Sequence, residues 1–473
     1  MPGIRESIAV VLLLLLAGAG AHGEHPAHSP SYEMTVAVDY DAGTYAGDLR
    51  VETTNVTGAP LGELFFRLYP NASGIYGGAA LDVPEVRVGD RIVDTATYVD
   101  DTVLLVPLPD PLAPGESVAV SLAFEGWVDD WTAGVAPRPG TYGLLTRSDR
   151  AMTLTAFYPI LAFATDEGWA LDPVFSFGDA LMSDASDYDV CVTVRSGLTP
   201  IASGVQEEAV ETDGAVTYRF TIDGARDFSI VVVDGYEDQR HLIEDVTLRT
   251  WFTAAKARAS SIALRHAADA LTLYQSLIGP IRFREVDIVE VPLQVAAGVE
   301  FSGLILVSSA YAERPLQTFF QIIVSHEMAH QWFYAGVGSD VTEDPWLDES
   351  FATYLSYLYL NAFAGSGVAS ATLEQWERAY ERSRLAEPNL AIDSPLYAFQ
   401  GSANYSGFVY SGGAVLLHAI RETIGDDAFF AALHSYYDRH LGGIAAPRDL
   451  IDAFETACAC SLGELLETYD VDP

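Results

Sequence analysis

The chain has 473 residues, and its 66 acidic residues against 25 basic ones give a formal net charge of −41. This length is ample for two or three domains, and a hydrophobic content of 49% predicts a globular protein rather than a disordered one. So acidic a surface repels phosphate backbones, and we therefore expect no nucleic-acid partner.

The first predicted element is an export signal over residues 1–22. Arg5 gives a positive start, and the apolar run IAVVLLLLLAGAG is too short to span a bilayer comfortably. The small residues of AGAGAHG then offer a signal-peptidase site near Ala21. We expect an exported (periplasmic or extracellular) protein with no integral membrane segment in its mature chain. A retained N-terminal anchor is the alternative.

An N-terminal β domain is predicted over residues 23–238. YEMTVAVDY alternates with a period of two, which is typical of a half-buried strand. Further β-branched and aromatic runs follow, separated by turn residues: SVAVSLAFEGW, YDVCVTVRS, AVTYRFTI and FSIVVVDGY. These runs favour a β-sandwich-like fold.

The pattern changes near residue 250. There the run TAAKARASSIALRHAADALTLYQSL has helical spacing and ends before Gly279 and Pro280. Two short strands follow, EVDIVEVP and GLILVS, and the chain after Arg314 is mostly helical in pattern. We therefore predict a second, mainly helical α+β domain over residues 239–473, which makes the fold class multidomain, β followed by α+β.

The three cysteines do not predict a disulfide framework, because their number is odd. Cys458 and Cys460 are expected to lie too close together for an easy bridge. We expect these two, like Cys191, to be small buried residues rather than ligands or nucleophiles.

The stretch VSHEMAHQWF, residues 324–333, holds two histidines four positions apart. On a helix, His326 and His330 project from one face and can present two imidazoles to one zinc ion. Glu327 lies beside that site, where a carboxylate can take a proton from the attacking water. This is the H-E-x-x-H arrangement of zinc peptidases. Two unrelated histidines on an amphipathic helix are the alternative.

A third ligand, Glu349, is predicted in TEDPWLDESFATYLSYLYL, with 18 residues between it and the second histidine. Asp344 and Pro345 fit the N-cap and first position of a helix, which places Glu349 in its first turns. Two histidines and one carboxylate leave a fourth zinc position open, as in catalytic sites. Asp348 is a neighbouring candidate, but its side chain should point about 100° away.

Together, HEMAHQWF, the 18-residue gap and PWLDESFATY closely resemble the gluzincin aminopeptidases related to aminopeptidase N. The resemblance extends to YPILAFATDEGW, GDALMSDASDYDVCVTV, ARDFSIVV and IVEVP, and covers about residues 32–440. It implies a saddle-like β domain followed by a thermolysin-like zinc-peptidase domain that hydrolyses peptides.

Two further site residues are implied by this resemblance. The family's G-x-M-E-N loop, whose glutamate binds the substrate's free α-amino group, matches AGVEFSG with Glu300 in the glutamate position; Val299 and Phe301 replace the methionine and asparagine. The family's oxyanion-binding tyrosine matches Tyr410 in FVYSGGAVLLHAI, where a helix is expected to begin just after it. Tyr405 is the alternative.

The large C-terminal helical domain of many relatives is not matched by the residues after Tyr410. We expect an exported zinc metallopeptidase that releases N-terminal residues from peptide substrates. The alternatives are a zinc endopeptidase with an open cleft, a catalytically weak peptide-binding protein and a purely structural exported protein.

Overall fold

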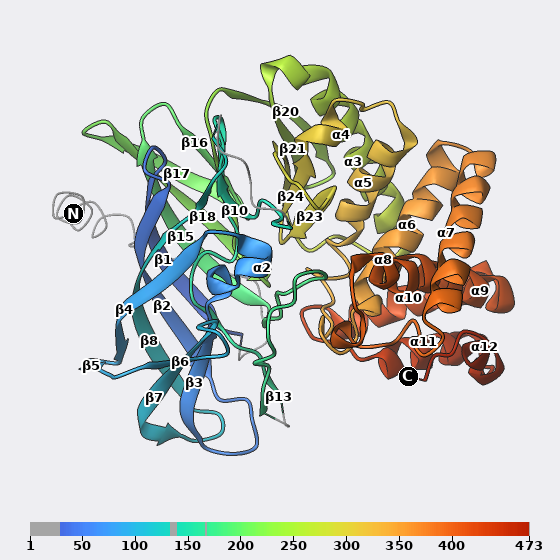
Figure 1. Cartoon of the computed structure of the whole chain (residues 1–473), viewed down its shortest axis with the longest axis horizontal. Helices are drawn as coiled ribbons and strands as arrows, with labels where there is room; N and C mark the ends of the chain where they lie inside the picture. Colours follow the sequence, from blue (N-terminus) through green and yellow to red (C-terminus); the bar gives the residue numbers. More distant parts are fainter. Residues whose placement is uncertain (1–28, 133–139, 166–167, 473) are drawn as a thin grey trace.

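The computed structural model describes residues 29–132, 140–165 and 168–472. The predicted export signal, residues 1–22, lies outside the described residues. Figure 1 shows a strand-rich N-terminal part on one side, a helical C-terminal part on the other and a smaller sheet between them. The predicted order of a β region followed by a mainly helical region is confirmed at this level.

The N-terminal part is built almost entirely from strands. They are β1 (Ser31–Asp39), β2 (Thr44–Thr54), β3 (Leu61–Arg67), β4 (Ala80–Val88), β5 (Arg91–Ile92), β6 (Ala96–Tyr98), β7 (Val103–Leu112), β8 (Ser117–Trp127), β9 (Asp129–Asp130), β10 (Leu145–Arg147), β11 (Ala151–Leu154), β12 (Ile160–Leu161), β13 (Ala164–Thr165), β14 (Gly168–Trp169), β15 (Ser186–Arg195), β16 (Thr199–Ala202), β17 (Val205–Thr212), β18 (Ala215–Ala225) and β19 (Ile230–Val233). A short helix, α2 (Ser73–Tyr76), interrupts them.

These strands form one large sheet and two smaller ones, besides the β13–β14 hairpin. The eight-stranded sheet has the order β17-β18-β15-β1-β2-β8-β4-β5, and the others are β16-β19-β11-β10-β9 and β12-β3-β7-β6. Every second residue of β1 is buried, as its alternating sequence predicts. One face of the large sheet can therefore pack on the core while the other meets water.

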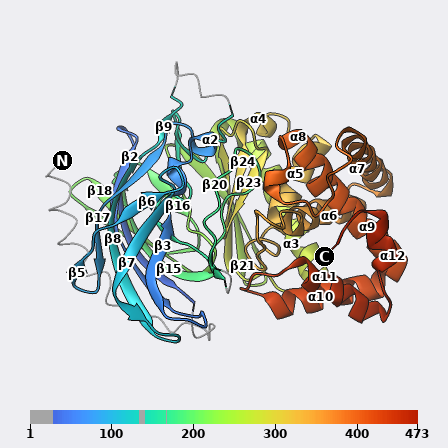
Figure 2. The ribbon, with the colours of Figure 1, turned by 60° about the horizontal axis from the view of Figure 1, so that its bottom comes forward.

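A further five-stranded sheet, here called the second sheet, lies between the N-terminal β part and the helices, as Figure 2 shows. Its strands are β20 (Tyr236–Ile243), β21 (Val246–Thr253), β22 (Glu285–Val291), β23 (Gly298–Phe301) and β24 (Leu304–Ser308). The order is β20-β21-β22-β24-β23, so β23 forms one edge and pairs antiparallel with β24. The strands β22 and β24 pair in parallel and are buried almost throughout, which fits the apolar run of β24, whereas β22 also buries Asp287 and Glu290.

The C-terminal part is helical. Its helices are α3 (Ala257–Leu277), α4 (Ser309–Ala312), α5 (Thr318–Ala329), α6 (Trp346–Phe363), α7 (Ser366–Ala386), α8 (Ser402–Tyr405), α9 (Gly413–Ile424), α10 (Asp426–His440), α11 (Pro447–Cys458) and α12 (Gly463–Thr468), with a π-helical turn at Ser406–Gly412. Helix α3 connects the parallel strands β21 and β22. In the described part of the chain, none of the helices combines the length and apolarity needed to cross a bilayer.

The domain boundary predicted after residue 238 falls inside β20, whose residues pair with β21 in the second sheet. The change of sheet comes instead between β19, which ends at Val233, and β20. Strands β20 and β21 form one more antiparallel hairpin. Their sequence pattern resembles that of the preceding strands, and only α3 changes the composition.

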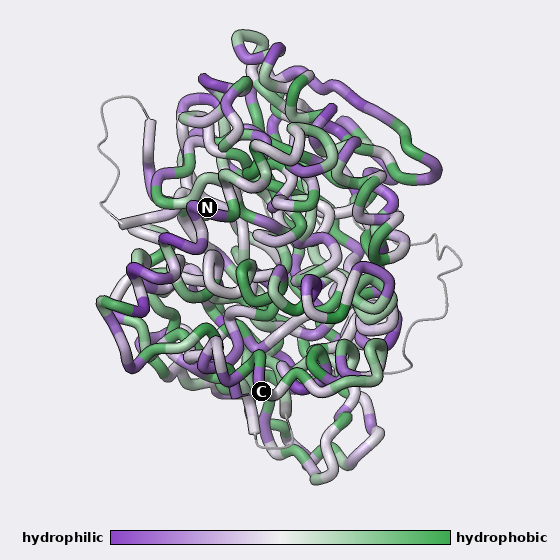
Figure 3. The backbone as a smooth tube through the Cα atoms, turned by 90° about the vertical axis from the view of Figure 1, so that its right-hand side faces the viewer, coloured by the Kyte–Doolittle hydropathy of each residue, from purple (hydrophilic) through white to green (hydrophobic). Residues whose placement is uncertain are grey.

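Each part has its own apolar core. Tyr158, Phe124 and Phe157 are fully buried in the N-terminal core, and Trp332 and Trp346 in the C-terminal one. Figure 3 shows hydrophobic stretches running through the interior, with many hydrophilic stretches on the outer loops. Residues of β23, β24 and the loop after α5 join the N-terminal core, which ties the two parts together.

The prediction for two of the cysteines was wrong, because Cys458 and Cys460 form a disulfide. Helix α11 ends at Cys458, and Ala459 then adopts a left-handed conformation with φ 52°. This turn sets the two Cα atoms 5.2 Å apart, within the usual range for a disulfide. Cys191 is buried and free, as expected.

Candidate active site

Two helices carry the three predicted metal ligands. His326 lies in the last turn of α5, and His330 follows as the residue that caps the helix. Glu349 lies in the first turn of α6, as predicted, but that helix begins at Trp346 with Pro345 at the N-cap position. Asp344 is thus one residue outside the expected cap. Its backbone carbonyl, rather than its carboxylate, accepts a hydrogen bond from the Leu347 N–H at 3.1 Å.

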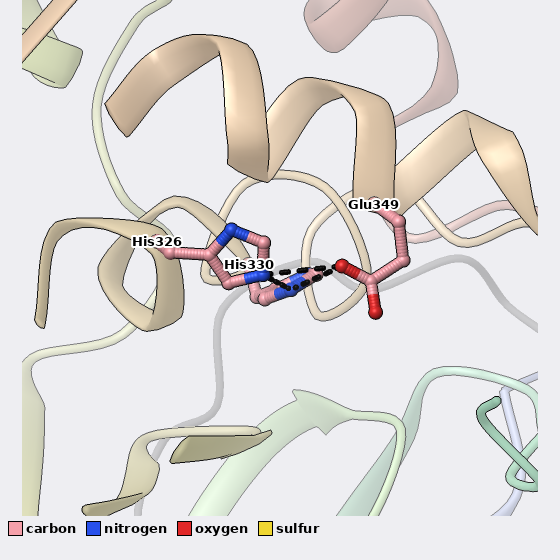
Figure 4. Close-up of side chains that lie close together, drawn as sticks. All are labelled: His326, His330 and Glu349. Carbon is pink, nitrogen blue, oxygen red and sulfur yellow. Dashed lines mark hydrogen bonds and ion pairs between the residues drawn. The ribbon is translucent and has the colours of Figure 1, made fainter. Parts of the chain in front are cut away.

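The donor atoms of these three residues converge, as Figure 4 shows. His326 Nε2 lies 3.1 Å from His330 Nε2 and 3.1 Å from Glu349 Oε2, and His330 Nε2 lies 3.5 Å from the same oxygen. A tetrahedral zinc centre with bonds of about 2.0–2.1 Å has edges of about 3.3–3.4 Å between its donors. The residues present therefore fit a zinc ion in both donor type and spacing.

Contacts behind the donors hold both imidazoles in the orientation that a metal needs. His330 Nδ1 lies 3.0 Å from the Phe333 carbonyl, to which an N–H donates, and this contact directs Nε2 toward the cluster. His326 makes a backbone hydrogen bond with Ala352. Burial would raise the pKa of Glu349, but hydrogen bonds from both histidines outweigh burial and hold the pKa at about 2. This carboxylate is therefore ionised.

Glu327 and Glu300 face each other beside this cluster. Carboxylate oxygens of Glu300 and Glu327 and a ring nitrogen of His330 all lie within 4.8 Å of one another. Burial raises the pKa of Glu327, and the charge of Glu300 raises it further. Glu300 lies on edge strand β23 and is only 8% exposed. Gly298, on the same strand, packs directly on Glu327, where an added Cβ would collide with the carboxylate.

Both candidate tyrosines reach the same cavity. The Tyr410 hydroxyl donates to Glu349 Oε1, and its ring stacks on His326 with centroids 5.9 Å apart. The buried Tyr405 hydroxyl has no hydrogen-bond partner among the described residues. The helix predicted to begin just after Tyr410 begins earlier, because α8, the π-helical turn and α9 run on without a break.

Close helix packing positions Tyr410. Ser350, next to the third ligand, donates a hydrogen bond to the Val409 carbonyl at 3.0 Å. Gly413 leaves the space that the Ser350 side chain occupies, since a Cβ there would collide with the hydroxyl. The tyrosine is therefore held in register with the helix that carries Glu349.

The cavity in front of the cluster has a volume of about 520 Å³. Five of the six predicted site residues line it, and His330 is the exception. The N-terminal part supplies one wall, including Tyr76, Tyr142, Phe177 and Asp179. Sequence reasoning missed this wall, because these residues carry no motif and are brought to the site only by the fold.

Two further carboxylates, the half-buried Asp179 and the buried Asp348, adjoin the site without belonging to the ligand cluster. Burial raises the pKa of Asp179, and Glu300 adds to the effect. Asp348 was the neighbouring ligand candidate. It accepts a hydrogen bond from the Glu349 N–H at 2.7 Å, and burial next to that residue raises its pKa to about 8. Among the described residues, Asp348 belongs to neither of the two clusters whose donor atoms could share a metal ion.

Known proteins are similar to this chain in sequence. Residues 263–469 match the Peptidase family M1 domain. The chain is 24% identical over 307 residues to "Probable aminopeptidase 1" of Saccharolobus solfataricus, covering 60% of this chain and 38% of that protein. It is 23% identical over 456 residues to "Aminopeptidase M1-C" of Oryza sativa subsp. japonica, covering 93% and 49%. The chain thus spans half or less of the length of these curated relatives.

The fold is also similar to that of a solved structure. The M1 zinc metallopeptidase of Deinococcus radiodurans superimposes with a TM-score of 0.68 at 21% sequence identity, over 94% of this chain and 95% of that one. The matched domain contains both histidines and Glu349, whose donors converge as described. Residues 263–469 therefore form a Peptidase family M1 domain, and the chain as a whole is similar to aminopeptidases of that family.

Proposed function

We propose that this protein is a zinc metalloaminopeptidase that releases N-terminal residues from peptides. The observation that carries the proposal is the position of Glu300, whose carboxylate lies within 4.8 Å of the Glu327 carboxylate and of the His330 ring nitrogen. A binding group for a free amino terminus then lies directly beside the hydrolytic groups.

His326, His330 and Glu349 hold the zinc ion in this proposal. When bound, zinc supplies a Lewis acid that polarises the scissile carbonyl and lowers the pKa of water. The ionised Glu349 carboxylate offsets part of the metal's charge. Because the Tyr410 hydroxyl donates to its second oxygen, one oxygen remains for the metal.

The position of Glu300 limits which peptide bond can react. In a peptide, the α-nitrogen and the carbonyl carbon of the same residue are about 2.5 Å apart, as the standard N–Cα and Cα–C bond lengths require. An ammonium paired with Glu300 therefore brings only the first peptide bond to Glu327. An internal peptide bond would leave the buried Glu300 carboxylate against an uncharged chain, which costs binding energy.

The other two residues act during bond cleavage. Glu327 takes a proton from the attacking water and passes it to the leaving amine, a role suited to a carboxylate whose pKa burial raises. Tyr410 donates a hydrogen bond from its hydroxyl to the oxyanion that forms on the carbonyl oxygen. Its contact with Glu349 holds that hydroxyl at the metal position.

We extend the proposal to the whole chain. Residues 23 to about 235 form the saddle-like β domain, and the following residues form the thermolysin-like catalytic domain. Residues 1–22 direct export and are removed. N-terminal sequencing of the protein secreted from a bacterial host tests the last point, because it would give a start near residue 22. A start at Met1 would contradict it.

The test of the main proposal is digestion of one mixed peptide set, first with free and then with acetylated N-termini, by the zinc-loaded protein. Mass spectrometry should show ladders of single residues lost from the free peptides only. Glu300→Gln keeps the side-chain shape and removes the charge. It should lower kcat/KM for free peptides and reduce the preference for them over acetylated ones.

Other outcomes would identify the alternatives. Internal cuts in both peptide sets would contradict the proposal and indicate an endopeptidase. Peptide binding without cleavage, with zinc confirmed in the protein, would indicate a binding protein. An unchanged preference in Glu300→Gln would remove Glu300 from the role of amino-group anchor while leaving peptide hydrolysis in place.

A further inference from the structure

The loop that follows the zinc-binding histidines contains a strained residue. Tyr334 has a φ of 123°, a conformation that side-chain-bearing residues rarely adopt. It is 4% exposed and lines the catalytic cavity. Such a conformation persists only where surrounding contacts impose it. The contacts of Tyr334 therefore show what holds this loop.

The side chain of Tyr334 is held by an aspartate from the N-terminal part. Its hydroxyl donates to Asp227 Oδ2 at 2.9 Å, and Asp227, between β18 and β19, is completely buried. The same oxygen accepts hydrogen bonds from the Ser302 backbone N–H and hydroxyl, both at 3.0 Å. One carboxylate oxygen thus joins the loop after α5 to the residue that follows β23.

The residue before this aspartate holds the backbone of the same loop. Arg226 Nε donates to the Tyr334 carbonyl at 2.6 Å, and another of its guanidinium nitrogens donates to the Gly443 carbonyl after α10. Its backbone N–H donates to the Ser302 hydroxyl at 3.0 Å. The Arg226–Asp227 pair therefore contacts both the backbone and the side chain of Tyr334.

The two elements joined in this way both serve the proposed site. On one side, Phe333, next to Tyr334, supplies the carbonyl that orients His330, and the Ala335 N–H donates to the His330 carbonyl at 3.0 Å. On the other side, Ser302 lies two residues beyond Glu300 on the chain. A shift at Asp227 would therefore move both the metal ligand and the amino-group anchor.

We propose that Asp227 and Tyr334 are positioning residues that set the spacing between His330 and Glu300. The inference rests on the proposed function for the role of Glu300, and on the fit of the site to zinc for that of His330. It makes the N-terminal part more than a wall of the cavity, because its buried aspartate fixes the geometry of a site to which it contributes no ligand.

Tyr334→Phe removes one hydroxyl, Asp227→Ala removes the shared acceptor, and Asp227→Asn keeps one carbonyl oxygen in its place. Loss of such an outer contact typically costs about 10–100-fold in metal affinity or activity. We expect Tyr334→Phe and Asp227→Ala to weaken zinc binding by this amount in a chelator competition and to lower kcat for free peptides. Asp227→Asn should recover part of both losses.

The double variant separates positioning from general destabilisation. Because both single changes break the same hydrogen bond, Tyr334→Phe combined with Asp227→Ala should bind zinc no more weakly than Asp227→Ala alone. Tyr437→Phe is the matched control. Its largely buried hydroxyl donates to the Pro280 carbonyl at 3.0 Å, away from the cavity, so its loss should leave zinc affinity and kcat unchanged.

Unchanged zinc affinity and kcat in folded Tyr334→Phe would overturn the inference, even if the variant melted at a lower temperature. Tyr334→Phe keeps this outcome accessible if Asp227→Ala fails to fold. A wild-type protein that binds zinc but removes no N-terminal residues would refute the proposed function instead. In that case the chelator competition would still test whether Asp227 and Tyr334 position His330.

Discussion

The metal-ligand cluster and strand β23, which carries the proposed amino-group anchor Glu300, are held in different ways. The cluster comes from two helices, α5 and α6, whose ligands are close in sequence and contact one another directly. Strand β23 is a four-residue edge strand. The C-terminal end of β23 is held by two side chains. Gln331 accepts a hydrogen bond from the Gly303 N–H at 3.0 Å and donates one to the Phe301 carbonyl at 3.1 Å. Asp227, in the N-terminal part, accepts a hydrogen bond from the Ser302 N–H.

The two regions therefore depend on different parts of the sequence. Helical spacing alone brings His326 and His330 together, so the ligand cluster is encoded locally. The position of Glu300 depends on contacts with residues far away along the chain. We therefore expect changes in β23 to affect catalysis without loss of metal, whereas changes in the helix pair affect both.

The largest effect is expected at the point where the two regions meet, at Glu327 on α5. Glu327→Gln should lower kcat by about 10²–10⁴-fold, the usual contribution of a general base, while zinc content stays at one ion per chain because no ligand changes. Steady-state kinetics and metal analysis measure the two quantities. A near-normal rate would remove Glu327 as the base.

Tyr410→Phe tests the side of the site formed by the helices. Loss of an oxyanion donor typically costs about 10²–10³-fold in kcat, and we expect KM to change little. Tyr405→Phe is the control, because its hydroxyl has no hydrogen-bond partner among the described residues. A greater loss of kcat in Tyr405→Phe than in Tyr410→Phe would exchange the roles of the two tyrosines.

Gly298→Ala tests the strand side. The new methyl group would collide with the Glu327 carboxylate and displace it. Because a displacement of about 1 Å can cost about 10²-fold in rate, we expect kcat/KM to fall by about that factor with zinc affinity unchanged. Gly62→Ala in β3, where a Cβ meets nothing within 4 Å, should have no effect. Loss of zinc in Gly298→Ala would mean that the two regions are not separable.

The smallest effect is expected far from both regions. Replacing Cys458 and Cys460 by serine opens a loop of very few residues, so the chain-entropy model gives a loss of only about 1.5 kcal/mol. The melting temperature should fall by a few degrees, with kcat/KM unchanged. Differential scanning calorimetry and peptide kinetics measure these quantities. A fall in kcat/KM would contradict the expected independence of this end of the chain.

How far the sequence predicts the molecule follows the same division. The β region, α3, the strands β22 and β24 and the helix pair could be predicted, because each has its own periodicity over many residues. The first three residues of β20 fell on the N-terminal side of the expected boundary, since strand patterns do not report which sheet they join. The left-handed turn at Ala459, which allows the disulfide, has no signal in residue type.

The candidate site divides in the same way. The three ligands and Glu327 follow from spacing within one or two helices. Glu300 and Tyr410 were available only through family resemblance, because a lone glutamate or tyrosine carries no spacing signal. Asp227, Tyr334 and Asp179 could not be predicted at all. Their roles depend on contacts between segments about 75 residues or more apart, such as the Asp227–Ser302 hydrogen bonds.

The π-helical turn at Ser406–Gly412 explains why two tyrosines compete for one role. In an α-helix, residues five apart point about 140° away from each other. In a π turn, hydrogen bonds join residues five apart, so such residues come onto the same side. Tyr405 and Tyr410 accordingly lie with their rings 5.8 Å apart. If this turn were α-helical with its length unchanged, the two rings would point about 140° apart, and only one of them could face the cavity.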